Sequence, residues 1–118
     1  MEGAQNQPLI DYDEGIRLCG GNAQLYADML RLFFSDPSLM RLEDAISRAD
    51  TQSAFLQAHT LKGLSSQLAL LRLYDESAFL CDILRQNGPS VILHAGSCLS
   101  VLQSVYRSTL LEISRKFP

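Results

Sequence analysis

The chain has 118 residues, of which 47% are hydrophobic and 19% are charged, and its net charge at pH 7 is −3. This composition is typical of one globular domain and excludes an intrinsically disordered chain. The acidic balance argues against a nucleic-acid-binding surface, which needs an excess of positive charge. We therefore expect no nucleic acid as a partner. Because no apolar run is long enough to span a bilayer, we expect no membrane as a partner either.

The first eight residues lack the charged-then-apolar layout of a signal peptide, and we expect a flexible lead at 1–8 before a domain at 9–118. The three cysteines, Cys19, Cys81 and Cys98, are odd in number and form no CxxC pair. This spacing argues against a disulfide framework or a zinc site. It favours buried free thiols in a reducing cytoplasm, with no metal or other cofactor.

Helical periodicity dominates the chain, and no segment shows the sustained alternation of a strand. The first expected helix is short, at about 9–19. Apolar residues then recur every three or four positions, and this pattern resumes after Pro37. We therefore predict one long helix over about 22–49, bent at Pro37. Two separate helices are the alternative, because Ser35-Asp36-Pro37 is also a signal to stop and restart a helix.

Three more helices are expected at about 51–69, 72–86 and 90–115. Asp50 is the predicted N-cap of the first, and Asn87-Gly88-Pro89 separates the other two. Long helices joined by short connections are typical of antiparallel neighbours. The predicted fold is therefore all-α, an antiparallel four-helix bundle with a short extra N-terminal helix. The residues expected to face its core from the last two helices are Leu73, Ser77, Leu80, Leu84, Ile92, Leu99, Leu102, Val105, Tyr106, Leu110 and Ile113.

The helix at 51–69 carries two stripes when its residues are placed about 100° apart around the axis. Small or aliphatic residues form the predicted core stripe: Ala54, Ala58, Leu61, Ser65 and Leu68. The second stripe contains Phe55, His59, Lys62 and Ser66, and it is flanked by Gly63 and Gln67. His59 is therefore predicted to stand on an outer face of the helix.

The run His59-Thr60-Leu61-Lys62-Gly63 has the chemistry of a phosphate-binding surface. Imidazole has an unperturbed pKa of about 6.5, so it is a nucleophile near neutral pH. Lys62 lies one turn further on the same face. A glycine inside a helix costs roughly 1 kcal/mol relative to alanine, so Gly63 needs a reason. One such reason is the close approach of a large partner to His59.

This run, followed by Ser65-Ser66-Gln67-Leu68, resembles the core motif of the histidine-containing phosphotransfer (HPt) domains of bacterial two-component phosphorelays. The resemblance covers about residues 11–84, and the final helix matches only in its helical character. The other positions where such domains carry similar residues are Gly15, Leu18, Gly20, Gly21, Tyr26, Leu30, Phe33, Pro37, Asp50, Leu73 and Leu80.

The resemblance implies that His59 accepts a phosphoryl group from a receiver-domain aspartate and passes it to an aspartate of another receiver. Lys62 would neutralise the phosphoryl oxygens, and Gly63 would leave room for the receiver. Ser66 and Gln67 would either bind the phosphate or stabilise the exposed face. Phe55 and Leu56 would form a docking surface for the receiver, unless they pack inside the fold.

The residues also indicate what the partner must contribute. No carboxylate cluster near His59 would hold Mg²⁺, and no glycine-rich nucleotide loop is present. The chain is thus expected to be a phosphocarrier rather than an enzyme, without kinase activity of its own, whose Mg²⁺ sits on the receiver. The expected partners are response-regulator receiver domains, including that of a hybrid sensor kinase, and the expected state is a cytoplasmic monomer.

One position departs from the family pattern. Where many members carry a glutamate or glutamine that hydrogen-bonds the other ring nitrogen of the histidine, this chain has Cys81, a poor acceptor. Asp82, Glu76 or a water could substitute, or His59 is held less firmly. The second histidine, His94, is predicted to be a surface or core-edge residue. Two rival interpretations remain: a degenerate member that only binds a receiver, and a helical adaptor with an unrelated partner.

Overall fold

The computed structural model describes residues 7–117, so most of the predicted lead, residues 1–6, lies outside the described part. Within 7–117 the fold is all-helical, and its one β pairing is an isolated antiparallel bridge between Ile10 and Leu70. The prediction of an all-α protein is confirmed. The helices are α1 (Tyr12–Leu18), α2 (Ala23–Phe33), α3 (Ser38–Ser47), α4 (Thr51–Gln67), α5 (Leu71–Leu84) and α6 (Val91–Lys116).

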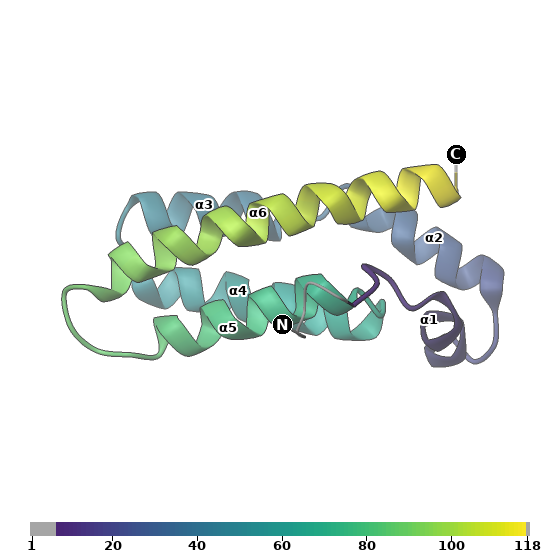
Figure 1. Ribbon diagram of the computed structural model, residues 1–118, viewed down its shortest axis with the longest axis horizontal. Coiled ribbons are helices and arrows are strands. Elements are labelled where there is room, and N and C mark those ends of the chain that lie inside the picture. Colours follow the sequence, from purple (N-terminus) through teal and green to yellow (C-terminus); the bar gives the residue numbers. More distant parts are fainter. Residues whose placement is uncertain (1–6, 118) are drawn as a thin grey trace.

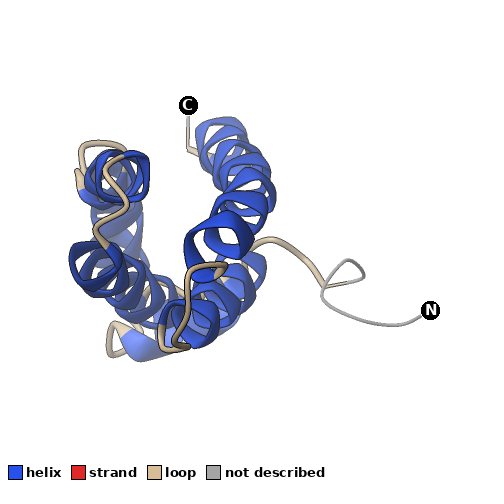
Figure 2. Cartoon of the chain, turned by 90° about the vertical axis from the view of Figure 1, so that its left-hand side faces the viewer, coloured by secondary structure: helices blue, strands red, loops and turns tan. Residues whose placement is uncertain are grey.

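The helices pack side by side around one hydrophobic core (Figure 1). α3 packs on α4, α4 on α5 and α5 on α6, and α6 also contacts α3. α6 has 26 residues, which at 1.5 Å per residue span about 39 Å of a molecule that is 45 Å long. Viewed toward one end in Figure 2, the helices lie around a common interior. Among its fully buried side chains are Tyr26, Leu30, Leu42, Leu61, Leu70, Leu73, Leu80, Leu102 and Ile113.

The prediction of one bent helix over 22–49 is wrong, because α2 ends at Phe33 and α3 begins at Ser38. Pro37 has no N–H to continue the helical bonding, and its ring disfavours a helical conformation at the residue before it. Asp36 then accepts a hydrogen bond from the Ser38 N–H at 2.9 Å, which helps to start the second helix. The apolar pattern resumed after Pro37 because both helices face the same core.

The first helix begins three residues later than predicted. Asp11 caps it by accepting a hydrogen bond from the Glu14 N–H at 3.1 Å. The residues before the cap are extended and pair with the turn between α4 and α5. The Asp11 N–H donates to the Ala69 carbonyl at 3.0 Å, and the Leu71 N–H donates to the Leu9 carbonyl at 2.9 Å. These bonds attach the start of the domain to the end of α4.

Tyr26 makes a second connection to the end of α4. Its side chain is 1% exposed, and its hydroxyl donates to the Leu68 carbonyl at 2.7 Å. This bond satisfies one of the carbonyls that a helix leaves unpaired at its C-terminus. Gly15 of α1 lies against the Tyr26 ring, where a larger residue would overlap the ring. α1, α2 and α4 are thereby held in a fixed relation.

The predicted core stripe of α4 is confirmed, since Ala54, Ala58, Leu61, Ser65 and Leu68 are all buried. The predicted core residues of α5 are buried too, and those of α6 are buried except Ile92 and Leu110, which are half-buried. Asp50 caps α4 by accepting from the Ser53 N–H at 3.0 Å and the Ser53 hydroxyl at 2.8 Å, and these bonds lower the pKa of its carboxyl.

All three cysteines are free thiols. Cys81 and Cys98 are buried as predicted, and Cys19 is half-buried. Burial raises the pKa of the Cys98 thiol to about 11. Over the described range, none of the helices combines the length and the apolar character that crossing a membrane would require.

Candidate functional site

The outer stripe of α4 lies where the helical pattern predicted it. His59 is exposed and Lys62, one turn further on, is half-buried. Phe55, one turn before His59, is also half-buried and packs against the core. Its ring centroid lies 5.8 Å from that of the imidazole, with 41° between the two planes. The core stripe of α4 faces inward, and this orientation leaves the imidazole accessible from outside.

Lys62 is not part of an ion pair within the described part of the chain, where every pair within 4.0 Å involves an arginine. Its ammonium lies 6.0 Å from the centroid of the Tyr74 ring on α5. A contact of this length is a weak cation–π interaction. The positive charge of Lys62 therefore remains available to an anion that arrives at His59.

Gly63 is exposed, and a Cβ added to it would meet no heavy atom of residues 7–117 within 4 Å. Packing inside the protein therefore does not explain why this helical position is a glycine. The surface beside His59 is open at this point. Leu56, on the same exposed part of α4, is 59% exposed, so of the two predicted docking residues Leu56 is on the surface and Phe55 is partly covered.

Arg85, the C-cap residue of α5, is a second cation on this face and was missed in the sequence analysis. Its guanidinium carbon lies 5.2 Å from the centroid of the Phe55 ring. Its salt bridge to Asp82, at 3.2 Å, is exposed and contributes little in water. One signal was available: Phe55 and Arg85 lie equally far along the chain from Leu70, so an antiparallel α4–α5 pair brings them together.

Cys81 is fully buried beside the two cations. Burial raises the pKa of its thiol, and the charges of Lys62 and Arg85 partly oppose that rise. Within residues 7–117, no side-chain hydrogen bond reaches the His59 ring. Of the two carboxylates predicted as substitutes, Asp82 pairs with Arg85. Glu76 is half-buried, and burial raises the pKa of its carboxyl.

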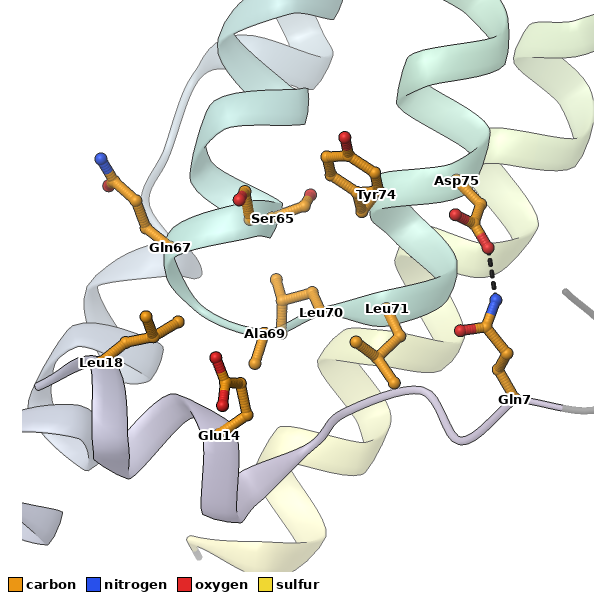
Figure 3. A pocket seen from close by; sticks show the side chains of 11 residues that line it. Gln7, Glu14, Leu18, Ser65, Gln67, Ala69, Leu70, Leu71, Tyr74 and Asp75 are labelled. Carbon is orange, nitrogen blue, oxygen red and sulfur yellow. Dashed lines mark hydrogen bonds between the residues drawn. The ribbon is translucent and has the colours of Figure 1, made fainter. Parts of the chain in front are cut away.

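Ser66 and Gln67 are exposed and follow on α4, Ser66 one turn after Lys62. Together with Tyr74 they line a cavity of about 420 Å³ at the end of α4, and neither His59 nor Lys62 is among its lining residues (Figure 3). The predicted phosphate-supporting residues therefore follow one another along α4. His59, Lys62 and Gly63 share the open face, and Ser66 and Gln67 continue from it to the cavity. His94 is exposed on α6, as predicted.

The open face can present an imidazole nucleophile next to two positive charges. Over the described range, no group of three or more histidine, cysteine, aspartate and glutamate side chains is placed to hold a metal ion. No family model matches the chain, and comparisons with curated proteins and with solved structures find no match either.

Proposed function

We propose that this chain is a histidine phosphotransfer module that carries a phosphoryl group between receiver domains on His59. One observation carries the proposal: His59 is exposed on α4, with Lys62 one turn away and open surface at Gly63. Phosphoryl transfer requires mainly positioning and charge stabilisation, which such a face provides. The HPt-like motif that contains these three residues supports the same function.

In the proposed step, the unprotonated ring nitrogen of His59 attacks the phosphorus of a receiver's aspartyl phosphate. The bond between phosphorus and the aspartate oxygen breaks as the phosphorus–nitrogen bond forms, and the aspartate leaves as a carboxylate. The other ring nitrogen keeps its proton, so the ring is transiently an imidazolium. Mg²⁺ stays on the receiver throughout. Reversal of this step on a second receiver completes the relay.

The two cations have separate places in this proposal. A phosphoryl group on His59 carries a charge of about −1.5 to −2 at pH 7. Lys62 would stabilise it from the C-terminal side of the ring, and Arg85 would do so from the Phe55 side. We further propose that α3 to α6 form an antiparallel four-helix bundle that offers the α4–α5 face to the receiver, in a cytoplasmic monomer without kinase activity.

The proposal is tested by incubating the chain with a receiver domain that carries ³²P on its aspartate, in the presence of Mg²⁺. We expect transfer of the label to this chain. A phosphohistidine is stable in base and labile in acid, so the label should survive alkali and be lost in acid. A label that survives acid but is lost in alkali would mean that a residue other than a histidine accepts the phosphoryl group.

The same experiment separates the rival functions. A receiver that binds the chain without transferring label would indicate a degenerate module that docks but no longer carries phosphate. The absence of a hydrogen bond to the His59 ring within the described residues makes this the principal rival. A chain that neither binds nor accepts label from any receiver in a broad panel would be an adaptor for another partner, and phosphotransfer would be rejected.

Replacing Lys62 with alanine should slow label transfer about tenfold or more, because a charge-assisted contact to the phosphoryl group is lost. The fold should lose less than about 0.5 kcal/mol, since Lys62 makes no ion pair with any residue of 7–117 and little packing is removed. Lys116→Ala is the matched control, because the Lys116 ammonium also lies over a tyrosine ring, 5.0 Å from the centroid of Tyr12. Transfer by Lys62→Ala at the rate of this control would contradict the role of Lys62.

Two replacements of Gly63 test its two expected effects, one on the stability of the fold and one on phosphoryl transfer. Gly63→Ala should stabilise α4 by up to about 1 kcal/mol, because the position is helical and its Cβ meets nothing. The bulkier Gly63→Leu should reduce transfer by obstructing the receiver. Gly96 of α6 is equally open, and Gly96→Leu serves as the control. Stability is measured by urea unfolding. If Gly63→Leu transfers as fast as the Gly96 variant, the open surface at Gly63 has no part in docking.

A further inference from the structure

The proposed transfer needs a His59 ring that is held in one orientation, because the attacking nitrogen must lie in line with the bond that breaks. Within residues 7–117, no side-chain hydrogen bond reaches this ring. An exposed side chain without a partner exchanges rapidly among its staggered rotamers. Another contact must therefore fix the imidazole if His59 is to meet a receiver in a reactive orientation.

Phe55 provides such a contact from the preceding turn of α4. Side chains on a helix lean toward its N-terminus, so the His59 ring is directed over the turn that carries Phe55. The two ring centroids are 5.8 Å apart, and the ring planes are inclined by 41°. This separation lies inside the range of attractive aromatic pairs, about 4.5–7 Å. In the described part of the chain, Phe55 is the one aromatic side chain that contacts the imidazole.

The Phe55 ring is itself held in place. It is half-buried and packs against the hydrophobic core. On α5, the Arg85 guanidinium carbon lies 5.2 Å from the centroid of this ring, within reach of a cation–π contact. Leu84 and Arg85 also line a surface hollow together with Phe55, where the start of α4 meets the end of α5. A ring fixed between two helices can restrict a neighbouring side chain, which a freely rotating ring could not.

We propose that Phe55 is a positioning residue for the phosphotransfer, whose ring holds the His59 imidazole in one rotamer in place of a hydrogen bond. In this role Phe55 touches neither the phosphoryl group nor the receiver aspartate, and it acts only through His59. The inference rests on the proposed function and adds to it the group that orients the acceptor. It gives this half-buried ring a task other than receiver docking.

Two replacements of Phe55 test this role in the label-transfer experiment. Phe55→Leu removes the ring and should slow transfer to His59 about three- to tenfold, the factor that corresponds to the energy of one aromatic pair. Phe55→Tyr keeps the ring and should transfer at the wild-type rate. Transfer by Phe55→Leu at the wild-type rate, or transfer by Phe55→Tyr that is as slow as by Phe55→Leu, overturns the proposal.

Phe117 offers a matched control, because its surroundings repeat those of Phe55 without a histidine. It is half-buried, the Arg31 guanidinium carbon lies 5.8 Å from its ring centroid, and its ring meets that of Tyr12 at 6.2 Å. Phe117→Leu should therefore cost a similar amount of stability and leave transfer unchanged. An equal loss of transfer in the two leucine variants would be an effect of stability, and the positioning role would be rejected.

A spectroscopic measurement reports the contact without any phosphotransfer. In ¹H–¹³C spectra of the imidazole protons, nuclear Overhauser effects should connect the rings of His59 and Phe55 in the wild type and in Phe55→Tyr. In Phe55→Leu the His59 signals should shift, because the ring current of Phe55 is lost, while the signals of His94 stay fixed. The absence of these effects in the wild type, or His59 signals that do not move in Phe55→Leu, overturns the proposal.

Failure of this inference differs from failure of the proposed function. A wild-type chain that accepts no label from any receiver overturns the proposed function and this inference with it. A wild-type chain that accepts label no faster than Phe55→Leu leaves phosphotransfer by His59 intact and overturns the inference alone.

Discussion

Replacing His59 with glutamine is expected to reduce the phosphoryl label on this chain to background. Glutamine is close to histidine in size and polarity, but its amide is not a nucleophile toward phosphorus. His59 is exposed and belongs to a helix whose opposite stripe is buried, so the substitution should change stability by less than about 0.5 kcal/mol. The loss should therefore be chemical, and a circular dichroism melt should show an intact helical fold.

The chain contains its own control for this experiment. It has two histidines, and the second, His94, is exposed on α6. His94→Gln should accept label at the wild-type rate. Labelling that persists in His59→Gln and disappears in His94→Gln would assign the wrong histidine. Labelling that persists in both single variants but is lost in the double variant would mean that neither histidine is specific.

Replacing Gly15 with alanine is expected to destabilise the fold by about 1–3 kcal/mol, the usual range for overpacking in a close-packed interior. The added methyl group would overlap the ring of Tyr26, which is buried and cannot swing into solvent. Displacing the ring would also weaken the hydrogen bond from its hydroxyl to the Leu68 carbonyl, a further loss of about 1 kcal/mol. Urea unfolding followed by circular dichroism measures the sum.

Two further variants show whether the overlap is the cause. Gly96→Ala places the same methyl group in open space on α6 and should not destabilise the protein. Tyr26→Leu removes the ring and the hydroxyl that the added methyl group would meet, so adding Gly15→Ala to that variant should cost much less than it costs in the wild type. Full additivity of the two substitutions would show that the methyl group and the ring do not interact, because residues in contact are coupled.

The orientation of α4 was predictable because it follows from a local rule. Residues three or four apart share a helix face, and in a small domain the most apolar face is buried. Ala54, Ala58 and Leu61 therefore pointed inward, and His59 had to point outward. The predicted cap at Asp50 is similarly local, since its side chain bonds an N–H three residues later. Asp11 caps α1 in the same way, but the sequence analysis placed the start of that helix three residues too early.

The break between α2 and α3 shows where periodicity is insufficient. The in-phase apolar residues on both sides of Pro37 predicted one helix, yet two short helices bury the same residues equally well. The backbone at Asp36 and Pro37 decided between the two arrangements. Periodicity reports which face is buried, and it does not report whether the chain is continuous between two stretches that share that face.

By itself, the sequence determined the helical class, the inward stripe of α4 and the exposure of His59 beside Lys62 and Gly63, because each depends on residues within a few turns of one another. Only the tertiary structure decided which distant groups meet. It brought Arg85 onto Phe55 and placed Tyr26 between Gly15 and Leu68. The physical reason is that these contacts depend on how whole helices pack, and packing is set by the shape of the entire core.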